Sequence, residues 1–93
     1  MKMGKSNLNA FEIINSYDEK KLADIFFEYG EEKFSKRIAK NIVIKRNIKP
    51  INNTTELSEI IKHSIPYTNS NKKIHPATRS FQALRIFIND ELN

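Results

Sequence analysis

The sequence predicts an all-α protein, a compact bundle of about five short helices. Apolar residues recur three and four positions apart along most of the 93 residues, which is the spacing of one helix face. Residues that cap helices stand before several of these segments. No segment alternates convincingly between apolar and polar residues, as a half-buried strand would. Because a chain of this length builds one hydrophobic core, we expect residues 1–93 to form a single domain.

The first two helices are predicted from the residues at their ends. Asn9 and Glu12 have the spacing of a capping box, in which each side chain binds the backbone amide of the other residue. Either Ser16 or Asp18 caps the second helix, and Gly30 is expected to end it in the left-handed conformation. The residues expected to face the core are Phe11 and Ile14 in the first helix, over about 10–15, and Leu22, Ile25, Phe26 and Tyr29 in the second.

The third and fourth helices follow the same logic. Glu31 and Glu32 stand where the third helix is expected to begin, and their charge complements the positive end of its dipole. Pro50 comes after its end, and Asn53 with Glu56 repeats the capping box for the fourth helix. The residues expected to face the core are Phe34, Ile38 and Ile42 in the third helix and Leu57, Ile60, Ile61 and Ile65 in the fourth.

The fifth helix combines an apolar stripe with a row of polar side chains. Pro76 suits its first position, and Asp90 and Glu91 place negative charge near its negative end. The stripe expected to be buried is Ala77, Phe81, Leu84, Ile88 and Leu92, and the polar row beside it is Thr78, Gln82, Arg85 and Asn89. Such a row either binds a planar polar partner or hydrogen-bonds a neighbouring helix or domain. The acidic end indicates either a frayed terminus or a helix that belongs to a longer protein.

Positive charge is concentrated in one part of the chain. Residues 33–55 carry seven Lys or Arg residues and no Asp or Glu, whereas the net charge of the whole chain is +5. Four of these residues recur at positions i, i+3, i+4 and i+7 and should share one outer face of the third helix: Lys33, Lys36, Arg37 and Lys40. Local positive charge favours a polyanionic partner, and the alternative is an ordinary solvated helix face.

The sequence excludes several kinds of functional site. Two glycines, Gly4 and Gly30, are too few for the Gly-rich turns that bind dinucleotides or nucleotide phosphates. The chain has no cysteine, and His63 and His75 lie apart, so we expect no metal site. No nucleophile motif is present either. No apolar run could span a membrane or serve as a secretory signal, so we expect no membrane contact. The absence of cysteine fits a cytoplasmic protein, which is the location we expect.

Two long segments resemble a known family. They read ADIFFEYGEEKFSKRIA over residues 23–39 and HPATRSFQALRIFINDEL over residues 75–92. Together they are similar to the bacterial 16S rRNA (cytosine-N4)-methyltransferases, and the similarity extends over nearly the whole chain. In these enzymes a helical domain, similar to a sterile alpha motif, is inserted into an α/β domain that binds S-adenosylmethionine. The resemblance implies that this chain is the insert alone, without the α/β domain.

The resemblance also implies an activity and partners. Members transfer a methyl group from S-adenosylmethionine to the exocyclic amine of a cytidine in small-subunit rRNA. Their cofactor-binding and catalytic positions lie in the α/β part, so we carry none of them over to this sequence. The implied partners are small-subunit rRNA or the 30S particle, together with the α/β domain. Both ends of the chain would then join that domain.

Two groups of residues are candidates for contacting these partners. The first is expected to meet rRNA phosphates and comprises Lys33, Lys36, Arg37, Lys40 and Arg46. The second is expected to contact RNA or to buttress the α/β domain and comprises Arg79, Gln82, Arg85 and Asn89. A competing interpretation is a stand-alone basic helical module that binds nucleic acid or protein without enzyme activity. A third is a structural spacer that orients the α/β domain or mediates dimerisation.

Overall fold

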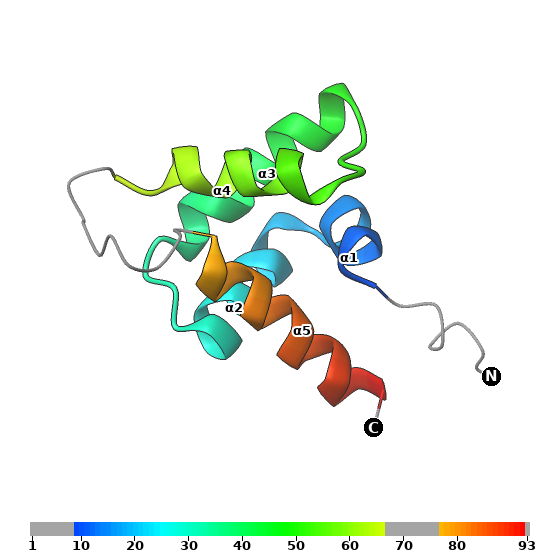
Figure 1. The fold of residues 1–93 in the computed structure, drawn as a ribbon, viewed down its shortest axis with the longest axis vertical. Helices are drawn as coiled ribbons and strands as arrows, with labels where there is room; N and C mark the ends of the chain where they lie inside the picture. The colour runs from blue at the N-terminus through cyan, green and yellow to red at the C-terminus, as the bar shows by residue number, and fades with distance from the viewer. Residues whose placement is uncertain (1–8, 67–76, 93) are drawn as a thin grey trace.

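The computed structural model describes residues 9–66 and 77–92, which form five α-helices and no strand (Figure 1). The helices are α1 (Ala10–Ser16), α2 (Glu19–Gly30), α3 (Ser35–Ile48), α4 (Thr54–Ser64) and α5 (Thr78–Leu92). Helix α2 packs against both α3 and α5, and α4 packs against α3. None of these helices is long and apolar enough to cross a membrane. The all-α prediction is confirmed, and Pro76 lies outside the described residues.

The predicted N-caps are present at three helices. The side chain of Asn9 accepts the backbone N–H of Glu12 at 3.0 Å, and that of Asn53 accepts the N–H of Glu56 at 2.8 Å. At α2 the cap is Asp18, whose Oδ1 accepts the N–H of Lys21 at 2.8 Å. Each cap satisfies an amide that the helix leaves without a partner. The alternative cap, Ser16, is instead the last residue of α1.

Gly30 has a different role from the one predicted. It is the last residue of α2, and the left-handed conformation belongs to Glu31, with φ of 52°. A Cβ atom on Gly30 would lie 2.6 Å from the carbonyl oxygen of Arg79 and 2.9 Å from the Cβ of Ala83. Both distances are shorter than van der Waals contact. Gly30 is therefore required for the close approach of α2 and α5, and the prediction that it forms the turn was wrong.

The start of α3 also differs from the prediction. The helix begins at Ser35, and the two preceding residues, Lys33 and Phe34, form a turn. Glu32 is buried beneath this turn, where its Oε2 accepts the N–H of Phe34 at 3.1 Å. Phe34 is only partly buried and lies outside the hydrophobic core, although its spacing from Ile38 predicted a core residue. The helical spacing does not apply to Phe34, because the turn precedes the helix.

The core contains most of the predicted residues of α1 to α4. Those that are fully or nearly buried as predicted are Ile14, Leu22, Ile25, Phe26, Ile38, Ile42, Leu57, Ile60 and Ile61. Phe11, Tyr29 and Ile65 are partly buried and pack against them. Ile13 and Ile51 were not predicted, and both are buried.

The buried face of α5 is rotated from the predicted stripe. Ala77 and Leu84 are buried as expected, whereas Phe81 and Ile88 lie at the margin of the core and the side chain of Leu92 lies outside the described residues. The other buried residues of this helix are Ser80, Ala83 and Phe87. Ala83 lies against Gly30, so small side chains of α5 face α2. They let this side of α5 pack closely against α2.

The end of α5 meets two tyrosines. The ring centroid of Phe87 lies 5.9 Å from that of Tyr17 and 5.6 Å from that of Tyr29, both in edge-on geometry. The hydroxyl of Tyr29 donates a hydrogen bond to Oδ2 of Asp90 at 3.2 Å. The acidic end of α5 thus has a partner within the domain. These contacts tie the last turns of α5 to α2 and to the segment before it.

The contacts of Tyr29 predict a shift of its pKa that NMR can measure. Desolvation of the Tyr29 hydroxyl, followed by the neighbouring Asp90 carboxylate, raises the pKa of Tyr29 above its ordinary value of about 10. Asp90→Asn should lower this pKa, as measured by NMR of isotope-labelled tyrosines. The pKa of Tyr17, which burial and then Glu91 raise, is the control and should not change. An unchanged pKa at Tyr29 would contradict the contact with Asp90.

The same shift fixes the sign of the pH dependence of stability. The folded protein holds the Tyr29 proton more tightly than the unfolded chain does. The resulting stabilisation is fully present below the unfolded-state pKa of about 10 and is lost as the pH rises through the folded-state pKa.

Candidate nucleic-acid interface

The outward side of α3 carries exposed positive charge. Ser35, Ile38, Ala39 and Ile42 face the core, which leaves Lys36, Arg37 and Lys40 exposed on the opposite side. We call these three residues the basic face of α3. The helix itself contains no Asp or Glu. The ion pairs found in residues 9–66 and 77–92, Lys49–Glu56 and His63–Glu59, do not involve the basic face.

The other two residues of the predicted phosphate-binding group lie in different surroundings. Lys33 is exposed in the turn before α3, so it adjoins the basic face without belonging to the helix. Arg46 is partly buried, and its Nη1 donates hydrogen bonds to the carbonyl oxygens of Ile14, at 2.9 Å, and Tyr17. These carbonyls belong to the C-terminal end of α1 and the residue that follows it. Arg46 thus joins α3 to α1, and we leave it out of the interface.

Acidic residues border one side of the basic face. Lys36 shares an open hollow between α2 and α3 with Glu19, Lys20, Ala23 and Asp24. The two carboxylates of this hollow weaken the attraction of Lys36 for an anion, because opposite charges nearby reduce the local potential. Arg37 and Lys40 do not line this hollow.

The predicted polar row of α5 is on the surface. Gln82, Arg85 and Asn89 are exposed, and Thr78 is partly buried. Arg79, which is predicted with Gln82, Arg85 and Asn89 to contact RNA or the α/β domain, is also exposed. Ile86 interrupts this polar surface with a side chain that is 47 % exposed. The row therefore points away from the core and presents amides and a guanidinium together.

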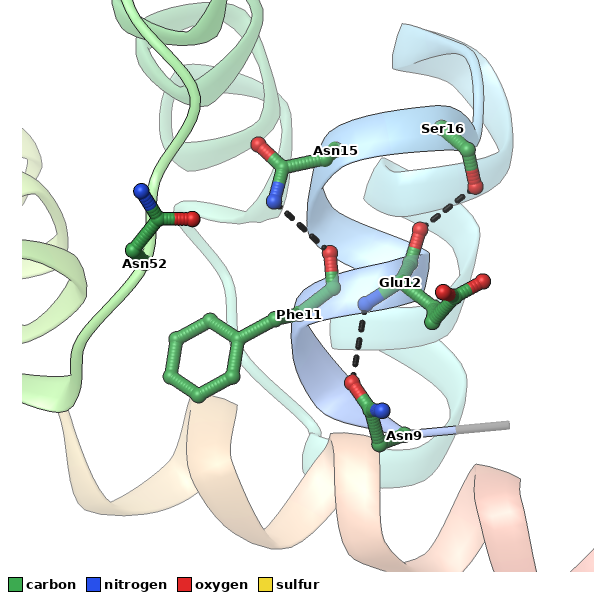
Figure 2. Close-up of a pocket in the computed structure, with 6 residues that line it drawn as sticks. All are labelled: Asn9, Phe11, Glu12, Asn15, Ser16 and Asn52. Atoms are coloured by element: carbon green, nitrogen blue, oxygen red, sulfur yellow. Dashed lines mark hydrogen bonds between the residues drawn. The ribbon is translucent and has the colours of Figure 1, made fainter. Parts of the chain in front are cut away.

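A second hollow, lined by residues of α1, its N-cap Asn9 and Asn52 of the α3–α4 connection, has mainly a structural role (Figure 2). Asn15 is its central side chain. Its Nδ2 donates to the carbonyl oxygens of Phe11 and Ile51, each at 2.9 Å, and its Oδ1 accepts the N–H of Ile51 at 2.9 Å. One amide side chain thereby fixes the α3–α4 connection to α1. Its donors and acceptor are used within the fold.

The part of the chain that the structure describes contains no group of three or more His, Cys, Asp or Glu residues placed to hold a metal ion.

Comparison with known proteins identifies the family. The sequence profile of the MraW methylase family matches residues 1–93. The chain belongs to this family. The resemblance that the two long segments indicated is thus confirmed.

Two members of the family are 54 % identical to the chain, and both are named ribosomal RNA small subunit methyltransferase H. The protein from Nostoc punctiforme matches over 92 residues, which are 99 % of this chain and 30 % of that protein. The protein from Trichormus variabilis matches over 88 residues, 95 % of this chain and 28 % of that protein. The chain therefore spans about three tenths of the length of these relatives.

Proposed function

We propose that this chain is the RNA-binding helical segment of a ribosomal RNA small subunit methyltransferase. The whole protein would act in the cytoplasm and transfer a methyl group from S-adenosylmethionine to the exocyclic amine of a cytidine in small-subunit rRNA. The identity of 54 % to two proteins of that name supports the assignment. The five helices would form one domain inserted into the α/β catalytic domain of the longer protein.

Neither of the two hollows between these helices fits S-adenosylmethionine. Nucleoside cofactors bind in enclosed and largely apolar pockets. The hollow between α2 and α3 is open and lined by four charged side chains and Ala23. The hollow beside α1 is open too, and five of its six lining residues are polar, with Asn15 bonded within the fold. We therefore assign the cofactor and the catalytic residues to the part of the longer relatives that this chain does not cover.

The observation that carries the proposal is the exposed basic face of a helix that contains no acidic residue. Phosphate groups of RNA attract such a surface, and the release of condensed counterions favours binding at low salt. Contacts to phosphates fix position and add affinity but do not read the bases. The domain would therefore hold rRNA while the rest of the protein selects the cytidine.

Salt dependence of binding tests the proposal. With about four phosphates contacted, by Lys33 and the basic face, log K against log[salt] should fall with a slope of about −3 for single-stranded RNA. Lys36→Gln/Lys40→Gln removes two of the contacts and should reduce the slope to about −1.4. Fluorescence anisotropy of a labelled RNA oligomer, measured at several salt concentrations, gives both slopes.

A matched pair of single variants controls for net charge. Lys40 and Lys62 are both exposed lysines on helices, but Lys62 lies on α4. Lys40→Gln should reduce the slope by about 0.7, whereas Lys62→Gln should leave it unchanged. Equal slopes in the wild type and the double variant would show that the basic face is only a solvated surface. If the chain does not bind RNA at all, the result would favour the interpretation in which it is a structural spacer that orients the α/β domain or mediates dimerisation.

The polar row of α5 is the second part of the proposal. Its exposed side chains, Gln82, Arg85 and Asn89, together with the exposed Arg79, would contact either RNA or the α/β domain of the longer protein. A row of amides and guanidinium groups suits both partners, since each offers planar polar groups and anionic oxygens.

A further inference from the structure

One arginine of the basic face lies against an aromatic ring. The guanidinium carbon of Arg37 is 5.8 Å from the ring centroid of Phe34, within the range of a cation–π contact. Lys36 and Lys40 are exposed on the same helix and have no such neighbour among the described aromatic residues. The contact restrains the Arg37 side chain while the residue stays exposed.

Packing in the core does not account for Phe34. It is partly buried, yet it is absent from the apolar residues that pack against the hydrophobic core. A hydrogen bond fixes its backbone, since its N–H donates to Oε2 of the buried Glu32 at 3.1 Å. Ser35 follows with its N–H bonded to the carbonyl oxygen of Glu32, also at 3.1 Å. The turn thus holds Phe34 at the surface, next to the basic face.

We propose that Arg37, held against Phe34, is a stacking surface for an unpaired RNA base. This inference rests on the proposed RNA binding and deepens it by naming the class of substrate. Guanidinium planes and aromatic rings are the groups on which proteins stack splayed-out bases of single-stranded RNA. Lys33 and Lys40, before and after Arg37 in the chain, would contact the phosphates on either side of the stacked base.

Stacking gives the interface a preference that phosphate contacts lack. The bases of an A-form duplex are paired and stacked on one another, so a duplex can meet this surface only through its backbone. A loop or bulge can offer a free base. The basic face of α3 should therefore bind single-stranded RNA more tightly than duplex RNA at equal ionic strength.

Removing the bases from the ligand tests the proposal. The full chain is titrated with a labelled oligoadenylate and with an abasic oligomer of the same length, which keeps every phosphate. The wild type should bind the oligoadenylate about tenfold more tightly. Arg37→Lys keeps the charge but lacks the planar group, and Phe34→Leu removes the ring that positions it. In both variants the preference should fall below about twofold.

Controls separate this inference from the proposed function. Phe27→Leu makes the same change at a ring that is 59 % exposed on α2 and should keep the preference of the wild type. Thermal melts confirm that each variant is folded, and Arg37→Lys should also keep the salt slope. A wild type that binds both oligomers equally, or an Arg37→Lys variant with an unchanged preference, would overturn the stacking inference and leave phosphate binding intact. Failure of the wild type to bind either oligomer would overturn both proposals.

Discussion

Phe87→Ala is expected to reduce the free energy of unfolding by about 3–5 kcal/mol. Phe87 is only 3 % exposed, and its ring packs in edge-on geometry against the rings of Tyr17 and Tyr29. The Nζ atom of Lys21 also lies 5.5 Å from its centroid. Small domains are stable by about 5–15 kcal/mol, so this loss is a large part of the total. Urea denaturation followed by circular dichroism measures it.

Arg85→Ala is the matched control on the same helix. Arg85 is exposed, and an exposed substitution away from structural contacts changes stability by less than about 0.5 kcal/mol. Phe81→Ala should lie between the two, because Phe81 is only partly buried. If Arg85→Ala unfolded the domain as readily as Phe87→Ala, the polar row of α5 would belong to the internal structure and not to an interface.

Gly30→Ala is expected to destabilise the domain by about 2 kcal/mol, although alanine is the better helix former. The new methyl group would meet the carbonyl oxygen of Arg79 at 2.6 Å and the Cβ of Ala83 at 2.9 Å. Neither atom can rotate away, because one belongs to the backbone and the other is bonded to it. The two helices must therefore separate. The midpoint of urea denaturation, measured for the variant and the wild type, gives the change.

Glu28→Ala provides the comparison for Gly30→Ala. Glu28 is exposed near the end of the same helix, so its replacement should change stability by less than about 0.5 kcal/mol. A Gly30→Ala variant that is more stable than the wild type would show that α2 and α5 are not in close contact at this point.

The helix caps could be predicted from the sequence because they are local. Asn9 and Asp18 bind amides three residues further along the chain, and the residue types at that spacing are sufficient evidence. The role of Gly30 could not be predicted in this way. Its neighbours, Arg79 and Ala83, are about fifty residues away, and only the packing of α2 on α5 brings them together. The same packing rotates the buried face of α5 toward small residues that a search for large apolar side chains overlooks.

In the candidate site, too, the local features could be predicted from the sequence and the long-range contacts could not. The spacing of Lys36, Arg37 and Lys40 placed them on one exposed face of α3, and the structure shows them there. Arg46 has the same charge and a similar setting in the sequence, but its acceptors are the carbonyls of Ile14 and Tyr17. Because these acceptors are backbone carbonyls far away in the chain, the residue types around Arg46 do not indicate that they bind it. The spacing of Phe34 from Ile38 predicts a core residue, but the turn before α3 removes Phe34 from the buried face.

A residue-resolved experiment can decide which partner the polar row of α5 contacts. Amide chemical shifts of the isotope-labelled chain can be followed while single-stranded RNA is added. Shifts at Gln82 and Arg85 would assign the row to RNA, and constant shifts there would favour the α/β domain as its partner.

The same titration tests the central claim, that the basic face of α3 is what meets RNA. We expect the largest shifts at Lys36, Arg37 and Lys40, with a smaller change at Lys33 in the preceding turn. Lys62, an exposed lysine on α4, should not shift. Shifts that are largest on α4, or a spectrum that RNA leaves unchanged at low salt, would contradict the account.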